Sequence, residues 1–118
     1  MVEDLAAAPD MDAVFHALAN GARRQMVGRL AGGEHTVTEL AEPLTMSLAA
    51  ASKHIKVLER AGLVHRTVDG RRHVCRLNPS PLASATAWLR FYERHWDERL
   101  DALSDLLSTS ESKETDAP

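Results

Sequence analysis

Residues 47–64, SLAAASKHIKVLERAGLV, decide the fold. In a helix with 3.6 residues per turn, one side of this stretch is apolar and carries Ala51, Ile55, Leu58 and Gly62. The opposite side is cationic and carries Ala49, Lys53, Lys56 and Arg60. Ser47 is a suitable N-cap, and Gly62 is a suitable terminator. The stretch therefore predicts a helix with one packed face and one cationic face. Its small alanines leave room for another molecule to approach the helix closely.

The charge of the chain is distributed unevenly. Residues 47–76 hold seven Lys or Arg and two acidic residues, whereas the whole chain of 118 residues has a net charge of -3. A basic segment in an otherwise acidic chain is typical of a protein that docks a polyanion with one face. The acidic residues in the rest of the chain limit non-specific binding to other molecules.

Four further helices are expected around this one. The periodicity of apolar residues predicts helices at 9–19, 21–31, 37–44 and 81–107. Thr36 and Glu39 have the spacing of a capping box at the start of the short third helix. That short helix and the cationic helix at 47–62, joined by a turn at Thr45 and Met46, form a helix-turn-helix.

A β-hairpin is expected directly after the cationic helix. Residues 63–68 and 71–77 are strand-like, and Asp69–Gly70 between them favours a type I′ turn. Cationic side chains gather toward the tip: Arg66, Arg71, Arg72 and His73. Such a hairpin is the wing of a winged helix, whose arginines can enter a minor groove or hold phosphates.

The last predicted helix carries four of the five aromatic residues of the chain. An apolar surface this wide exceeds what a small core needs and usually marks an interface. We expect a symmetric homodimer, to which the first helix contributes. The expected interface residues are Phe15, Leu82, Trp88, Leu89, Phe91, Tyr92, His95, Trp96, Leu100 and Leu103.

Length and composition predict one mainly α domain at 9–107, with a flexible N-terminus at 1–8 and a disordered polar tail at 108–118. No run of eighteen apolar residues predicts a membrane span, and the N-terminus lacks the pattern of a signal peptide. Cys75 is the single cysteine. A cytoplasmic location is expected, with Cys75 acting as a small hydrophobe in the second wing strand.

Three stretches resemble the ArsR/SmtB family of small bacterial repressors: ALANGARRQMVGRL, TVTELAEPLTMSLAAASKHIKVLERAGLV and DGRRHVCRLNP. The aromatic-rich WLRFYERHWDERLDAL resembles the last helix of one subgroup. The resemblance implies a winged helix homodimer that binds a palindromic operator in double-stranded DNA. It places Ser47, Ala49, Ala50, Ser52, Lys53 and His54 toward the major groove. With the neighbouring helix and wing residues, the predicted DNA-contacting set also includes Leu48, Lys56, Arg60, Arg66, Arg71, Arg72 and His73.

Neither familiar metal site of that family is present in the sequence. A thiolate site needs Cys where Ala41 and Pro43 stand. A zinc site on the last helix fails at Arg99 in one frame, and at Leu106 and Thr109 in the other. We therefore expect no metal and no cofactor, and an effector that the sequence does not identify.

No pattern of an enzyme emerges: there is no Gly-rich phosphate loop, no nucleophile elbow and no activated cysteine. The expected function is sequence-specific repression of transcription, including that of its own gene, under a non-metal signal. Two alternatives stay open. One is a metal-responsive repressor with an unrecognised site, and the other is a dimeric protein-interaction module with a basic face.

Overall fold

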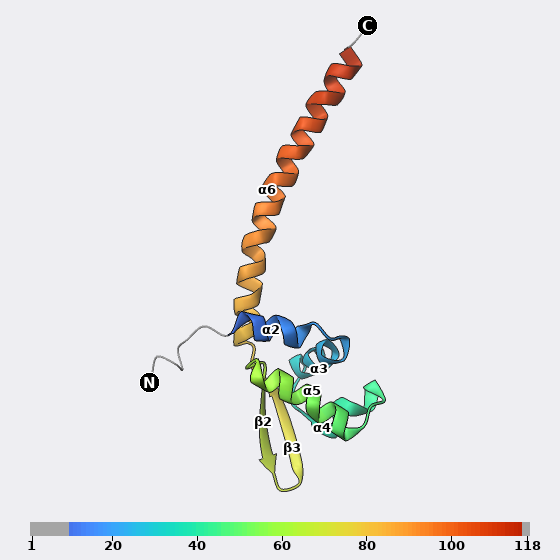
Figure 1. The fold of residues 1–118 in the computed structure, drawn as a ribbon, viewed down its shortest axis with the longest axis vertical. Coiled ribbons are helices and arrows are strands. Elements are labelled where there is room, and N and C mark those ends of the chain that lie inside the picture. The colour runs from blue at the N-terminus through green and yellow to red at the C-terminus, as the bar shows by residue number, and fades with distance from the viewer. Residues whose placement is uncertain (1–9, 117–118) are drawn as a thin grey trace, which may run out of the picture. The chain divides into compact units, whose positions relative to one another are not determined.

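The computed structural model describes residues 10–116, with side chains up to Thr109, so the expectation for residues 1–8 lies outside the described part. Its first helices are α2 (Met11–Leu18) and α3 (Gly21–Ala31). They are followed by strand β1 (His35–Thr36), helix α4 (Val37–Ala41), the 3-10 helix η1 (Glu42–Leu44) and helix α5 (Leu48–Arg60). Strands β2 (Val64–Asp69) and β3 (Arg72–Leu77) precede helix α6 (Ser80–Asp116) (Figure 1). The predicted winged helix-turn-helix is confirmed.

The wing is part of a three-stranded antiparallel sheet with the order β1-β3-β2. Two-residue β1 pairs His35 with Cys75 and was not predicted, because so short a segment carries no alternation of its own. The register pairs Asp69 with Arg72, so the turn consists of Gly70 and Arg71. Gly70 has φ of 63° and Arg71 has negative φ, as in type II′. The predicted Asp69–Gly70 turn of type I′ is therefore wrong.

One hydrophobic core joins the helices before α6, and the first residues of α6, to the base of the hairpin. Met26, Leu40, Ile55, Leu58 and Leu63 are its largest side chains with no exposure. The other members are Val14, Ala17, Val27, Leu30, Ala41, Ala51, Ala61, Val64, Cys75 and Ala85. Figure 1 shows α2, α3 and α5 packed together, with the hairpin leading away from the end of α5.

The end of α5 is a Schellman motif centred on Gly62. The N–H of Gly62 donates to the carbonyl of Glu59 (2.9 Å), and the N–H of Leu63 donates to that of Leu58 (3.0 Å). Gly62 has φ of 77°, in the left-handed region that favours glycine. The motif ends α5 and turns the chain into β2.

Asn78, which follows β3 at the base of the wing, bonds to this same turn. Its side-chain Nδ2 donates to the Gly62 carbonyl (2.9 Å), and its backbone N–H donates to the Leu63 carbonyl (2.8 Å). The start of β2 and the end of β3 are thereby held against the terminus of α5.

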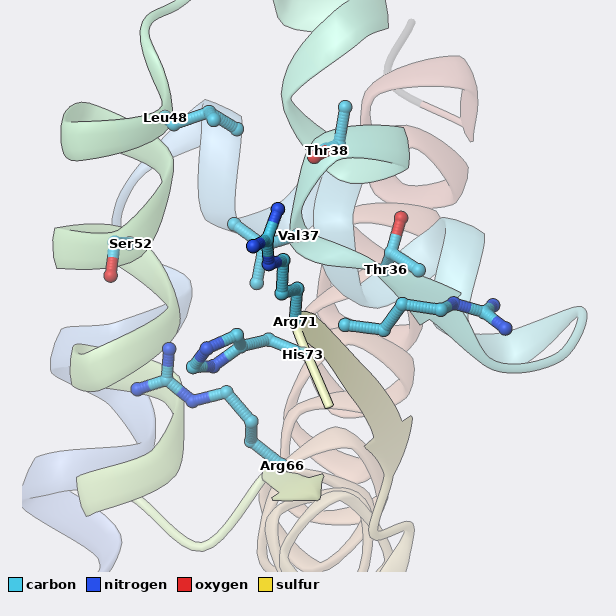
Figure 2. Close-up of a pocket in the computed structure, with 9 residues that line it drawn as sticks. Thr36, Val37, Thr38, Leu48, Ser52, Arg66, Arg71 and His73 are labelled. Atoms are coloured by element: carbon cyan, nitrogen blue, oxygen red, sulfur yellow. The ribbon is translucent and has the colours of Figure 1, made fainter. Parts of the chain in front are cut away.

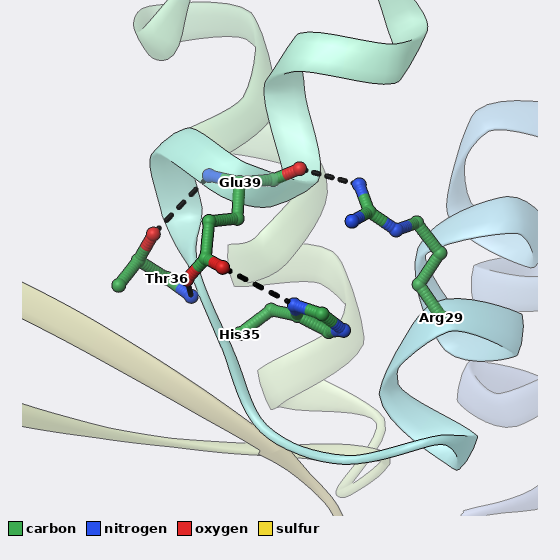
Figure 3. A network of polar contacts seen from close by, with 4 residues as sticks. All are labelled: Arg29, His35, Thr36 and Glu39. Carbon is green, nitrogen blue, oxygen red and sulfur yellow. Dashed lines mark hydrogen bonds and ion pairs between the residues drawn. The ribbon is translucent and has the colours of Figure 1, made fainter.

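The predicted capping box at the start of α4 is confirmed (Figure 3). The Glu39 N–H donates to Thr36 Oγ1 (3.2 Å), and the Thr36 N–H donates to Glu39 Oε1 (2.9 Å). The bond that the Thr36 N–H donates to the carboxylate is the largest reason that the pKa of Glu39 is below its ordinary value of 4.5. The other carboxylate oxygen lies 3.6 Å from buried His35 Nδ1, too far for a hydrogen bond. Arg29 donates to the Glu39 carbonyl and so ties α3 to α4.

Helix α6 reaches Asp116, whereas the sequence predicted its end near Leu107 and a disordered tail at 108–118. The segment 108–116 contains neither Gly nor Pro, so its polar side chains do not interrupt the helix. The chain divides after Ala85, and the remainder of α6 forms a second unit.

Replacing Gly62 with Ala should lower the free energy of unfolding by about 1–2 kcal/mol, because an L residue is strained at positive φ. The added Cβ would lie 3.6 Å from Pro81 Cγ, an ordinary contact, so the cost is conformational. Urea denaturation measures this change. Gly28→Ala is the matched control: it lies inside α3 with open space around it and should stabilise the chain by about 0.5–1 kcal/mol. Wild-type stability in Gly62→Ala would contradict the account.

The charge of Glu39 should make stability depend on pH. Because folding lowers its pKa, the carboxylate adds stability above 4.5, and this addition is lost as the pH falls through the lowered pKa. Glu39→Gln keeps an acceptor oxygen for the capping box and removes the charge. Wild type should therefore exceed Glu39→Gln in unfolding free energy at about pH 6, and the difference should shrink toward about pH 3. A difference that does not vary with pH in denaturation curves would refute this.

Candidate nucleic-acid interface

Helix α5 presents two chemically distinct faces. Ser47 Oγ accepts from the Ala50 N–H (3.1 Å) and starts the helix where the sequence predicted. Ala51, Ile55 and Leu58 are fully buried. The exposed residues of the outer face are Ala49, Lys53, Lys56 and Arg60. Because the core fixes the first face, the cationic face points to solvent.

A cleft of about 450 Å³ lies between the start of α4, the first turns of α5 and the wing (Figure 2). Its lining residues are Thr36, Val37, Thr38, Leu48, Ser52, Arg66, Arg71, Arg72 and His73. Figure 2 shows Arg66 and His73 extending from the wing toward α5, and Arg71 beside Val37. The cleft combines several basic side chains with the exposed apolar surface of Leu48.

The structure brings the predicted DNA-contacting residues together in two groups. The first group lines the cleft and consists of Leu48, Ser52, Arg66, Arg71, Arg72 and His73. The second group lies on α5 or its cap without lining the cleft and consists of Ser47, Ala49, Ala50, Lys53, His54, Lys56 and Arg60.

Arg66 is engaged within the protein. Its Nη2 lies 2.6 Å from Glu59 Oε1, and the side chains of Arg66 and Glu59 are 16% and 30% exposed. This charge-assisted hydrogen bond connects β2 to α5. Arg66 is thus less free to bind an external anion than Arg71 and Arg72, which are exposed at the tip.

His54 is turned away from the cationic face. Its Nδ1 lies 3.2 Å from Nη1 of Arg23 on α3, and the contact is partly buried. Successive residues of a helix point about 100° apart, so Lys53 can face solvent while His54 faces α3. The prediction for His54 followed the family resemblance and had no information on this contact.

Cys75, on wing strand β3, is fully buried. Burial raises the pKa of its thiol above the ordinary 9.0, while the nearby Arg66 guanidinium opposes that rise. The neutral thiol packs as a small apolar group, as the sequence suggested.

The sequence analysis missed the contribution of α4 to the cleft. Thr36, Val37 and Thr38 line it at the point where α4 begins. The capping box marked this position, but it was interpreted only as a helix start.

The predicted interface residues fall into two sets. Phe15 and Leu82 are half-buried and pack against the core. The exposed set lies on α6: Trp88, Leu89, Phe91, Tyr92, His95, Trp96, Leu100 and Leu103. Within it, the rings of Trp88 and Tyr92 have centroids 4.6 Å apart, and Phe91 contacts Tyr92 edge-on at 5.2 Å. Leu106 and Leu107 extend this apolar surface.

Two properties of the described residues concern other kinds of site. Between residues 10 and 116, no helix has the length and apolar content needed to cross a membrane. Among the side chains that the structure describes, no group of three or more His, Cys, Asp and Glu is placed to hold a metal ion.

The family of helix-turn-helix domains matches residues 18–67. The chain is 40% identical over 98 residues to the HTH-type transcriptional regulator Rv2034 of Mycobacterium tuberculosis, covering 83% of this chain and 89% of the relative. It is 28% identical to the transcriptional repressor SdpR of Bacillus subtilis, over 67% of this chain and 88% of that protein.

Solved structures agree with these relatives. The ArsR family transcriptional regulator RHA00566 superposes with a TM-score of 0.68 at 37% identity, covering 73% of this chain and 94% of that one. The homodimeric winged helix-turn-helix DNA-binding domain Mb0332 of Mycobacterium bovis has a TM-score of 0.57 at 33% identity, covering 76% and 81%. By its sequence identity to these regulators and by the winged helix geometry around α5, the chain belongs to the ArsR family of DNA-binding transcriptional regulators.

Proposed function

We propose that the protein is a homodimeric repressor that binds a palindromic operator, including one at its own promoter, and responds to a signal other than a metal ion. The observation that carries this proposal is the exposed cationic face of α5 beside the basic cleft of the wing. Both surfaces belong to one folded unit, and a polyanion can contact them together.

Each surface has a different part in recognition. Helix α5 enters the major groove, where Lys53 can donate to base edges and the alanines permit close approach. Leu48 is 56% exposed and can contact a thymine methyl group. Arg71 and Arg72, at the wing tip, hold phosphates or enter the adjacent minor groove.

The dimer is formed through α6. Its large apolar side chains from Trp88 to Leu107 are all at least 42% exposed on the single chain. An aromatic and leucine-rich surface of this extent is expected to be covered by a partner. The relative from Mycobacterium bovis is homodimeric and supports a second copy as that partner. Two copies of α5 would then enter successive major grooves about 34 Å apart, which requires an operator with two-fold symmetry.

The proposals of repression and of a non-metal signal rest on sequence comparisons. The relative from Bacillus subtilis is a transcriptional repressor, which supports repression as the function of this chain. Ala41, Pro43 and Arg99 replace ligands that the two familiar metal sites of the family require. These replacements support a signal other than a metal ion.

Selection of duplexes from a random pool by the purified protein tests the proposal, with fluorescence anisotropy of the selected duplex as the readout. We expect a palindromic consensus, preference over a shuffled duplex, and affinity that falls steeply with salt. Equal affinity with zinc and with chelator supports a non-metal signal, whereas release by zinc would show a metal site. No enriched sequence would refute sequence-specific binding.

Replacing Lys53 with Ala should weaken binding to the selected duplex by about 1–3 kcal/mol and relax sequence preference, because its ammonium donates to a base. The shuffled duplex should be affected less. Arg76→Ala removes the same charge from a residue that pairs with Glu34 (2.9 Å), and it should leave affinity nearly unchanged. Equal losses by Lys53→Ala on both duplexes would assign Lys53 to a phosphate instead.

Replacing Trp96 with Ala should raise the dimer dissociation constant by about tenfold or more, because buried aromatic residues dominate interface energies. Sedimentation equilibrium measures this constant. Trp96 is 59% exposed on the single chain, so its loss acts through association and not through the core. Trp96→Phe should retain most of the affinity. An unchanged dimer in Trp96→Ala would remove Trp96 from the interface.

A further inference from the structure

Arg23, in the first turn of α3, contacts both neighbouring helices. Its Nε donates to the Ala17 carbonyl (2.7 Å), and its Nη2 donates to the His16 carbonyl (3.0 Å). Its Nη1 lies 3.2 Å from His54 Nδ1 on α5. One guanidinium therefore joins the end of α2 to the middle of the cationic helix.

The contacts to α2 have a clear physical origin. The last carbonyls of a helix have no partner within it, and a cationic side chain there also matches the helix dipole. The side chain of Asn20 caps α3 by accepting from the Arg23 N–H (3.1 Å), which places Arg23 beside those carbonyls. The adjacent Arg24 donates from Nη1 to the Leu18 carbonyl (2.9 Å). Arg24 thus performs the same capping of α2, but its bond joins α3 to α2 alone.

The contact to α5 determines which atom of His54 accepts a hydrogen bond. A guanidinium only donates hydrogen bonds, so Nδ1 of His54 must be the acceptor. A residue on the cationic helix is therefore committed to an internal hydrogen bond.

The position of this bond relates it to DNA binding. His54 directly follows Lys53, whose side chain is exposed on the outer face of α5. A rotation of α5 about its axis would move Lys53, Lys56 and Arg60 together. Core packing of Ile55 and Leu58 fixes which face of α5 is buried. The directional bond between His54 and Arg23 further restricts the angle at which α5 lies against α3.

We infer that Arg23 is a positioning residue for DNA recognition: it links α2 to α5 and, through His54, sets the orientation in which α5 presents its cationic face. His54 is the acceptor in this link and does not contact a base. The inference rests on the proposed role of α5 in reading DNA.

The test measures affinity for the selected duplex in variants that melt well above the assay temperature. Arg23→Lys keeps the charge but cannot span three acceptors, and His54→Leu removes the acceptor. Each should weaken binding by about tenfold, the scale of a hydrogen bond to a charged group. His54→Asn offers an oxygen near the position of Nδ1 and should bind within about twofold of wild type. Arg24→Lys is the matched control on the same helix and should also stay within about twofold.

A double variant distinguishes one shared link from two independent contributions of Arg23 and His54 to DNA binding. The double variant Arg23→Lys with His54→Leu should lose about tenfold, not about a hundredfold, because both changes remove one link. Loss in His54→Asn equal to that in His54→Leu would overturn the inference, because His54 would then contact DNA itself. If Arg23→Lys does not fold, the two His54 variants decide the question. Lys53→Ala distinguishes failure of this inference from failure of the proposed function. If Lys53→Ala weakens binding but the Arg23 and His54 variants do not, only the positioning role is refuted.

Discussion

The left-handed backbone at Gly62 is the constraint on which the placement of the wing beside α5 depends. It ends α5 with two hydrogen bonds, from Gly62 to Glu59 and from Leu63 to Leu58. The next residues enter the core and then β2, so the direction of the wing follows from this one turn. Asn78 closes the same turn from the end of β3. Because the wing is held at this point, its arginines and the outer face of α5 can act on one polyanion.

The basic segment serves two purposes, and only geometry separates them. Arg66 is paired with Glu59 and fastens the wing to α5, while Lys53, Lys56 and Arg71 remain exposed. Arg23, which lies outside the basic segment, is used entirely inside the protein. Pairing costs less than leaving a charge half-buried and alone, so cations near a packed surface acquire partners and those beyond it stay available.

The surface of α6 poses a different physical requirement. Aromatic and leucine side chains on a helix without tertiary cover expose apolar area to water, which a second copy would remove. The first unit of the chain thus contains both the cationic face of α5 and the basic cleft, whereas a dimer would supply the symmetry that a palindromic operator demands.

The sequence alone was sufficient to predict features that depend on residues close to one another in the chain. The capping box at Thr36, the cap at Ser47, the stop at Gly62 and the two faces of α5 all follow from side chains within a few residues of one another. The end of α6 was misplaced because polar residues without Gly or Pro weaken a helix without ending it.

Tertiary structure decided what depends on distant partners. The pairing of β1 with β3 and the joining of α4 to the wing arginines in one cleft require contacts between remote segments. The choice of His54 as an internal acceptor rests on Arg23, 31 residues earlier in the chain. A helical period assigns a residue to a face, but only the packed neighbour determines whether that face meets protein or solvent.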